Sequence, residues 1–324
     1  MCGQAHRIMC LRWEGTVSKS HGNRARARHN PVRVGVLKTK VGVIIPVKDA
    51  HRYIGNCVRS LLGQTFSDFE LLIFEDGRAP WTERIVERFG DPRIRYFRNE
   101  VSLGIGASRN RGLKLCEAKY VFFTDGDYVL SKDWIEQGLK SLGTLDYVGV
   151  EGRTYYVSGD YVPTYSDHVC ENKAPGNFMT GNIAYRRDVL MSVGGFDQRY
   201  SYFEDRDLAL RILRKAKITF NPRMVAYAQQ QTLTYRDLLG RRREASNRVY
   251  LYKRFGERKC MLWRILLPWN LAKVIFPPVV FSSLLLSKFD SSSDFELLPF
   301  KYVYALLERL EIWKTCAKER VFLI

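Results

Sequence analysis

Residues 120–127 read YVFFTDGD, an apolar run that ends in two carboxylates. The run is typical of a buried strand, and Asp125 and Asp127 follow it with no turn residue before them. In open α/β sheets, ligands collect in the crevice beyond the carboxyl ends of the strands. Carboxylates placed there can hold a divalent cation against a diphosphate. A simple turn is the alternative, because Asp and Gly are also common turn residues.

Two earlier apolar runs predict further buried strands. Residues 41–47 read VGVIIPV, and residues 69–74 read FELLIF and lead into Glu75-Asp76-Gly77. Near-continuous apolar runs are typical of strands that are covered on both faces, as in a parallel sheet. Between the runs, apolar residues at three- and four-residue spacing predict a crossover helix: Ile54, Cys57, Val58, Leu61 and Leu62. This alternation indicates an α/β fold with a doubly wound, mostly parallel sheet.

Five segments, in this order, resemble the family 2 glycosyltransferases of the GT-A fold. They are VGVIIPVKDA (41–50), ELLIFEDG (70–77), NEVSLGIGASRNRGL (99–113), YVFFTDGDYVLSKDWIE (120–136) and FMTGNIAYRRDVLMSVGGFDQRYSYFEDRDLALRI (178–212). The resemblance covers roughly residues 41 to 235. It implies an inverting enzyme that takes a sugar from a nucleoside-diphosphate donor, with UDP as the default nucleotide.

The resemblance also implies a set of nucleotide-sugar-binding residues: Pro46, Val47, Asp49, Asp76, Arg109, Asp125 and Gly126. Arg109 is implied to face the nucleotide base, and Asp76 the pyrimidine or ribose. Asp127 is the implied ligand of Mg²⁺ or Mn²⁺, and Asp125 shares the metal or meets the ribose. A bound cation stabilises the negative charge of the departing diphosphate.

Three positions depart from the family pattern. Lys48-Asp49 stands where an aromatic-Asn pair is usual, and Glu75 replaces an Asp. A histidine is frequent after the last strand of related enzymes, but this chain has glutamines at 229–231. The last departure implies either fewer protein ligands for the metal or weakened activity.

The acceptor side is predicted from residues 178–212. By the resemblance, Glu204-Asp205 supplies the catalytic base, with Asp205 as the base and Glu204 as its supporting neighbour, and Gly181-Asn182 lies on the acceptor side. Asp205 would accept the proton of an acceptor hydroxyl as the new bond forms. The alternative is structural, because acidic residues in the first turn of a helix stabilise its dipole.

Charge and cysteine content bound the partners and the compartment. Residues 1–40 hold nine Lys or Arg against the single Glu14, within a chain of net charge +18. This segment is predicted to be a basic, disordered tail; a solvated tail, a membrane or partner contact and nonspecific nucleic-acid binding remain open. No base-reading module accompanies it, so no specific nucleic-acid partner is predicted. Seven scattered cysteines without a CxxC pair predict reduced thiols in the cytoplasm.

Residues 236–324 form a predicted helical extension that associates with the membrane. A cluster of Arg and Lys precedes an apolar stretch, 265–287, which reaches the roughly 20 residues that a bilayer span needs. Pro268, Pro277 and Pro278 interrupt it. An in-plane or re-entrant segment, a packed lid and a true span are the alternatives. A further helix is predicted around Tyr304 to Lys314.

These observations predict a metal-dependent, inverting glycosyltransferase at the cytosolic face of the membrane, of the kind used in polysaccharide and cell-envelope biosynthesis. Its acceptor would be a hydroxyl of a lipid-linked or surface glycan. One alternative is a polyprenyl-phosphate sugar synthase. Another is an inactive relative that binds sugar nucleotide or membrane as a scaffold, which the missing histidine motivates.

Overall fold

The structure is a computed structural model that describes residues 39–77, 80–144, 146–157, 168–257, 261–262, 265–266, 271, 275 and 292–323. The chain divides into two compact units, Met1–Leu37 and Lys38–Ile324. The first unit lies outside the described residues, and so does the predicted basic tail apart from its last two positions. Residues 41–235 and the C-terminal extension both belong to the second unit.

One eight-stranded sheet organises the second unit, in the order β3-β2-β1-β4-β7-β6-β8-β5. Its first half consists of β1 (Val41–Val47), β2 (Phe69–Asp76), β3 (Ile94–Asn99) and β4 (Tyr120–Phe123). All pairings within this half are parallel. The predicted buried strands are confirmed, since β1, β2 and β4 are buried along their whole length.

The second half of the sheet is mixed. It consists of β5 (Tyr128–Leu130), β6 (Tyr147–Tyr156), β7 (Ile183–Arg186) and β8 (Lys217–Ala228). Strand β7 is antiparallel to both β4 and β6, and β5 is antiparallel to β8, whereas β6 and β8 run parallel. Four of the seven described strand pairings of this sheet are thus parallel, as predicted, and each of the three antiparallel ones involves a strand of this half. An apolar run reports burial on both faces, not strand direction.

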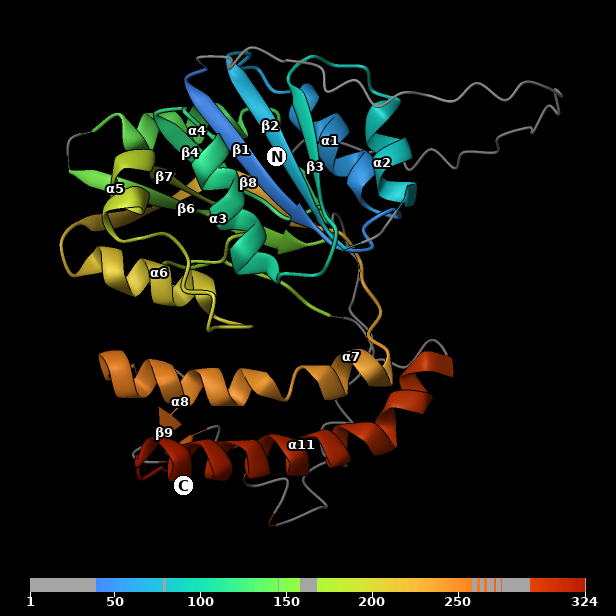
Figure 1. Cartoon of the computed structure of the whole chain (residues 1–324), viewed down its shortest axis with the longest axis vertical. Helices are drawn as coiled ribbons and strands as arrows, with labels where there is room; N and C mark the ends of the chain where they lie inside the picture. The colour runs from blue at the N-terminus through green and yellow to red at the C-terminus, as the bar shows by residue number, and fades with distance from the viewer. Residues whose placement is uncertain are drawn as a thin grey trace, which may run out of the picture. The chain divides into compact units, whose positions relative to one another are not determined.

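Helices cover both faces of the sheet (Figure 1). One face carries α1 (Ile54–Leu62), α2 (Pro80–Glu87) and α4 (Trp134–Leu142), and the other α3 (Ile105–Leu115), α5 (Arg187–Ser192) and α6 (Glu204–Leu213). Successive side chains of a strand point to opposite faces of the sheet. Val43 and Ile45 therefore pack in the core on the side of α1, α2 and α4, and Ile44 packs in the core on the side of α3, α5 and α6. The doubly wound prediction and the crossover helix at α1 are confirmed.

In its described part, the C-terminal extension has the helices α7 (Tyr235–Gly240), α8 (Arg243–Phe255) and α11 (Ser292–Glu319), and a short hairpin of β9 (Met261–Leu262) and β10 (Ile265–Leu266). Helices α8 and α11 share an apolar core of Ala245, Val249, Ile312, Cys316 and Leu323. The helix predicted around Tyr304 is thus part of α11. In the described part of the chain, no helix is both long and apolar enough to cross a bilayer. Most of the apolar stretch 265–287 lies outside the described residues.

Candidate active site

The Asp125-Gly126-Asp127 loop joins β4 to β5 at the carboxyl end of β4. Parallel strands β1, β2 and β4 end at this same edge, with Ile44 of β1 opposite Phe123 of β4. The loop packs tightly against β1, because a Cβ added at Gly126 would lie 2.7 Å from Val47 Cγ1. The sequence therefore needs glycine between the two carboxylates so that the loop can pack against β1.

Arg109 of α3 links the two acidic motifs. Its guanidinium is almost completely buried and donates from Nη2 to Asp125 Oδ1 at 2.8 Å and from Nη1 to Glu204 Oε1 at 2.6 Å. Burial disfavours the charged form, but the two carboxylates outweigh it and raise the pKa of Arg109. The Phe196 ring lies 5.5 Å from the guanidinium carbon. The contact with the nucleotide base that the resemblance implied for Arg109 stays a prediction.

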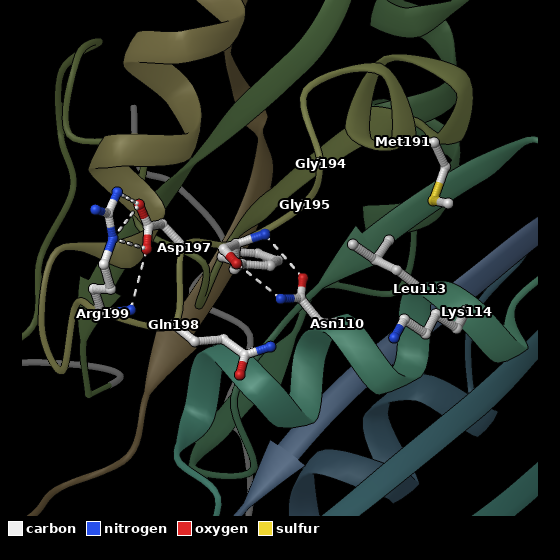
Figure 2. A pocket seen from close by; sticks show the side chains of 10 residues that line it. Asn110, Leu113, Lys114, Met191, Gly194, Gly195, Asp197, Gln198 and Arg199 are labelled. Carbon is white, nitrogen blue, oxygen red and sulfur yellow. Dashed lines mark hydrogen bonds and ion pairs between the residues drawn. The ribbon is translucent and has the colours of Figure 1, made fainter.

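Asn110, the next residue of α3, fixes the segment that leads to Glu204. Its Nδ2 donates to the carbonyl of Phe196 and its Oδ1 accepts from the Phe196 backbone N–H, both at 2.8 Å. Asn110 also lines a cavity of about 560 Å³ between α3 and residues 191–199 (Figure 2). None of the predicted site residues lines this cavity. Adjacent residues of α3 thus hold both ends of the segment from Phe196 to Glu204.

Asp127 is held by the segment that follows β8. The backbone N–H of Gln229 donates to the Asp127 carbonyl at 2.8 Å, and Gln231 Nε2 donates to Asp127 Oδ2. Burial, and then the neighbouring charge of Asp125, raise the pKa of Asp127 to about 7. Gln231 therefore stands beside the predicted metal ligand, in the region where related enzymes often have a histidine. Its amide favours the ionised carboxylate by donating a hydrogen bond.

The fit of this site to a divalent cation depends on two carboxylates. Among the described residues, no three Asp, Glu, His or Cys side chains form a group that could hold a metal ion. Arg109 and Gln231 donate to Asp125 Oδ1 and Asp127 Oδ2, and within the described ranges no side chain donates to Asp125 Oδ2 or Asp127 Oδ1. Mg²⁺ is commonly bound through one or two carboxylates together with substrate phosphates. The two Asp residues therefore fit a cation that arrives with a diphosphate.

Glu204 and Asp205 begin α6 and have different surroundings. Glu204 is the ion-pair partner of Arg109, whereas Asp205 accepts hydrogen bonds from the backbone N–H groups of Arg206 at 2.7 Å and Thr180 at 3.4 Å. Burial, and then the charge of Glu204, raise the pKa of Asp205 to about 7, against the opposing charge of Arg109. A carboxylate with such a pKa is a stronger base than an ordinary Asp.

The predicted nucleotide-binding residues at the ends of β1 and β2 differ in their exposure and in their hydrogen bonding. Pro46 and Val47 are buried in β1, and Asp49 is exposed in the loop after it. Asp76 is buried and accepts four hydrogen bonds, from Asn99 Nδ2, Ser102 Oγ and the backbone N–H groups of Leu103 and Gly104. Four donors fill the usual capacity of a carboxylate. Asp76 thus organises the loop into α3, and its contact with a nucleotide stays a prediction.

Gly181 and Asn182, predicted on the acceptor side, make different contacts. A Cβ at Gly181 would lie 2.4 Å from the Tyr128 ring, next to the Asp-Gly-Asp loop. The Asn182 side chain is buried: its Oδ1 accepts from Trp134 Nε1 at 2.8 Å, and its Nδ2 donates to the carbonyls of Arg153 and Met224. The amide of Asn182 therefore holds strands together in the core.

Two residues of this region were not singled out from the sequence. Glu151 lies in β6 and is buried among backbone N–H groups of residues 176–178. Arg206 follows Asp205 and reaches Gly176 and Glu257. An acidic residue inside the apolar run 148–152 is the one signal that could have indicated Glu151.

Comparison with known proteins agrees with this geometry. The family described as Glycosyl transferase family 2 matches residues 42–205, about half of the chain. In Staphylococcus aureus, TarS residues 1–349 in complex with UDP superimpose with a TM-score of 0.53 at 17% identity, over 87% of this chain and 91% of that one. The mannosyltransferase PcManGT of Pyrobaculum calidifontis, solved with GDP-Man and Mn²⁺, gives 0.51 at 14% identity over 86% and 74%. The fold is thus that of the GT-A glycosyltransferases.

Curated relatives extend the comparison at the level of sequence. Glycosyltransferase GlyA of Streptococcus pneumoniae is 31% identical over 54% of this chain and 24% of its own length. The glucosyl-dolichyl phosphate glucuronosyltransferase of Haloferax volcanii is 29% identical over 49% and 56%. The chain therefore spans between about a quarter and about half of these relatives. It belongs to glycosyltransferase family 2 and is a glycosyltransferase enzyme.

Proposed function

We propose that this enzyme transfers a hexose, with inversion, from a nucleoside-diphosphate sugar to a hydroxyl of a lipid-linked or surface glycan. The observation that carries the proposal is the position of Arg109, which contacts Asp125 and Glu204 with one guanidinium. A single side chain spans only a few ångströms. The Asp-Gly-Asp loop and the Glu204-Asp205 pair must therefore face the same small volume. An acceptor bound beside Asp205 then lies next to the donor.

The chain's own residues divide the work of the reaction. Asp125 and Asp127 would hold Mg²⁺ or Mn²⁺, which neutralises charge on the diphosphate when bound. Asp205 would take the acceptor proton as the hydroxyl attacks the anomeric carbon from the face opposite the leaving group. Because Asp205 must be ionised and its pKa is raised to about 7, turnover should increase as the pH rises through that value. Glu204 forms an ion pair with Arg109 and thereby orients the Glu204-Asp205 pair.

UDP is the nucleotide that we expect, and GDP is the next candidate. TarS has been solved with UDP and with UDP-GlcNAc, and PcManGT with GDP-Man. A lipid-linked acceptor is supported by the Haloferax volcanii relative, whose name gives a dolichyl-phosphate-linked acceptor. A polyprenyl-phosphate sugar synthase is the alternative enzyme, and it differs in having the lipid phosphate itself as the acceptor.

We also propose that the enzyme works at the cytosolic face of the membrane, on anionic lipid. Residues 236–324 hold seventeen Lys and Arg against nine Asp and Glu. Helix α11 exposes Val303, Leu310 and Trp313 by 41%, 56% and 44%, and spacing places them on one side of the helix beside exposed Lys314. An apolar stripe with flanking cations suits a helix that lies in the plane of an anionic bilayer.

A donor panel tests the proposed function. The full chain is incubated with UDP-, GDP- and dTDP-sugars and Mn²⁺, and nucleotide release is measured with and without a chelator. We expect chelator-sensitive release from a UDP-sugar, with acceleration by a glycan acceptor. Acceleration by a polyprenyl phosphate instead would favour the synthase. Binding of a nucleotide sugar without release from any donor would favour the scaffold that the glutamine at 231 motivates.

A further inference from the structure

Residues 172–180 form a loop, called the 172–180 loop, that leads into the predicted acceptor side. A buried carboxylate holds this loop through hydrogen bonds. Glu151 of β6 accepts hydrogen bonds from the backbone N–H groups of Gly176, Asn177 and Phe178, the last at 2.7 Å. The side chain of Asn172 donates to the same carboxylate at 3.2 Å. One carboxylate therefore fixes three consecutive peptide units.

Arg206 grips the same loop from the other side. Its Nη1 donates to the carbonyl of Gly176 at 2.8 Å, so Gly176 is held through both its N–H and its C=O. Its Nε and Nη2 donate to Glu257 Oε2 at 3.0 and 2.7 Å, in an ion pair whose side chains are 11% and 16% exposed. Glu257 follows α8 and belongs to the C-terminal extension, which therefore contributes to this grip.

The contacts of Glu151 and Arg206 with the 172–180 loop, which we call the grip, lie next to Asp205. Thr180, at the end of the 172–180 loop, donates its N–H to Asp205, and Arg206 is the residue that follows Asp205. Two bulky residues near this point have a left-handed backbone, Phe178 at φ 58° and Phe203 at φ 64°. Such conformations persist only where surrounding contacts enforce them, and they cluster at functional sites. The contacts of Glu151 are the enforcing contacts for Phe178.

We propose that Glu151 and Arg206 are positioning residues that hold the 172–180 loop against Asp205 as a wall of the acceptor site, and that Glu257 orients Arg206 for this task. The inference rests on the proposed function and goes beyond it. Neither Glu151 nor Arg206 touches the donor side, where Asp125, Asp127 and Arg109 lie. Their loss should therefore affect transfer and leave nucleotide binding unchanged.

The test compares Glu151 and Arg206 with a buried ion pair elsewhere in the sheet. Glu151→Gln and Arg206→Lys change the grip, while Glu70→Gln and Arg95→Lys change the pair Glu70–Arg95, which joins β2 and β3 and whose side chains are 0% and 17% exposed. Four quantities are measured for each variant: the Kd of UDP with Mn²⁺, the kcat and the KM for transfer from the donor that the panel identifies, and the rate of amide hydrogen exchange in residues 172–180.

We expect both grip variants to lower kcat/KM for the acceptor on the order of 10- to 100-fold, the scale of a misplaced reacting group. The Kd of UDP should stay within about twofold, and exchange in residues 172–180 should accelerate. The control pair should change neither transfer nor this exchange. Faster exchange in the grip variants with undiminished transfer would overturn the inference alone. A wild-type chain that turns over no donor would remove the proposed function and the inference with it.

Discussion

Arg109 Nη1 lies 2.6 Å from Glu204 Oε1, although the two residues are 95 positions apart in the chain. The same guanidinium reaches Asp125, and no other cation forms an ion pair with either carboxylate in the part of the chain that the structure describes. One buried charge thus balances two acidic motifs that the sequence places on separate elements. Arg109 thereby couples the Asp-Gly-Asp loop to the first turn of α6.

Arg109→Met should destabilise the fold, because it leaves Glu204 buried without its partner. Removing one member of a buried pair commonly costs 3–5 kcal/mol, and we expect about 3 kcal/mol here because Asp125 is partly exposed. Urea unfolding at pH 7.5 measures this change. Arg199→Met, which removes an exposed partner of Asp197, is the matched control and should change the free energy of unfolding much less. Equal losses in the two variants would argue against a central role for Arg109.

Asp127→Asn should abolish metal-dependent release of nucleotide and weaken nucleotide-sugar binding, with the fold intact. The amide loses the charge that attracts the cation, and it can place a donor where a ligand oxygen is needed. Calorimetric titration with UDP and Mn²⁺, together with circular dichroism, measures both effects. Asp146→Asn, in an exposed turn, is the control. Full activity of Asp127→Asn, or of the wild type in a chelator, would contradict the metal assignment.

Asp205→Asn should keep donor binding and lose transfer by on the order of 10²-fold or more, the scale expected for a positioned base. The single amide oxygen can keep the short backbone hydrogen bond from Arg206, 2.7 Å to Oδ1, while the long one from Thr180, 3.4 Å to Oδ2, is lost. Single-turnover transfer and the Kd of UDP separate the two effects. If transfer continues at the wild-type rate, Asp205 serves only as a charge in the first turn of α6.

The stability of the protein should respond to pH through Asp205. Its folded pKa is raised to about 7 against about 3.9 in an unfolded chain, so folding takes up a proton between these values. Its contribution to stability is fully present below about pH 4 and is lost as the pH rises through 7. Asp205→Asn removes this loss, so its Tm relative to wild type should rise between pH 5 and pH 8. A pH-independent difference in Tm would contradict the raised pKa.

Trp313→Ala should weaken flotation with vesicles that contain anionic lipid, because it removes apolar surface from the exposed side of α11. Trp81→Ala is the matched control, since Trp81 is 60% exposed on α2. Truncation after Gly256 would be less informative, because it removes Glu257 and exposes the face of α8 that packs on α11. If the two variants float equally, or if the wild type does not float, the exposed apolar side of α11 serves another partner.

The sequence predicted part of the first half of the fold, and β3, α2 and α3 were not predicted. Burial on both faces and helical spacing follow from side-chain pattern alone, and they located β1, β2, β4 and α1. The direction of β7 could not be read in this way, because its apolar residues are compatible with either pairing. The helix that begins at Glu204 was located, because the apolar face after it repeats at helical spacing.

The site was predicted as a set of residue types, and the partners of those residues were not. Asp76 looked free for a ligand, yet its four donors come from Asn99 and from the loop before α3, which no local pattern pairs with it. Asn182 was predicted on the acceptor side, yet its amide lies in the core. Such contacts join distant segments, and their specificity appears only when the chain is folded. Glu151 escaped notice for the same reason.

Efforts to redesign the specificity of this enzyme by random mutagenesis meet a limit set by two glycines. Any side chain at Gly126 would run into Val47, and any at Gly181 into the ring of Tyr128. In a library that varies the Asp-Gly-Asp loop, variants with a side chain at position 126 should therefore misfold. The exposed positions Lys48 and Asp49 meet no such packing constraint, but Asp49 has a left-handed backbone at φ 52°, so Asn and Gly are the substitutions that fit it best.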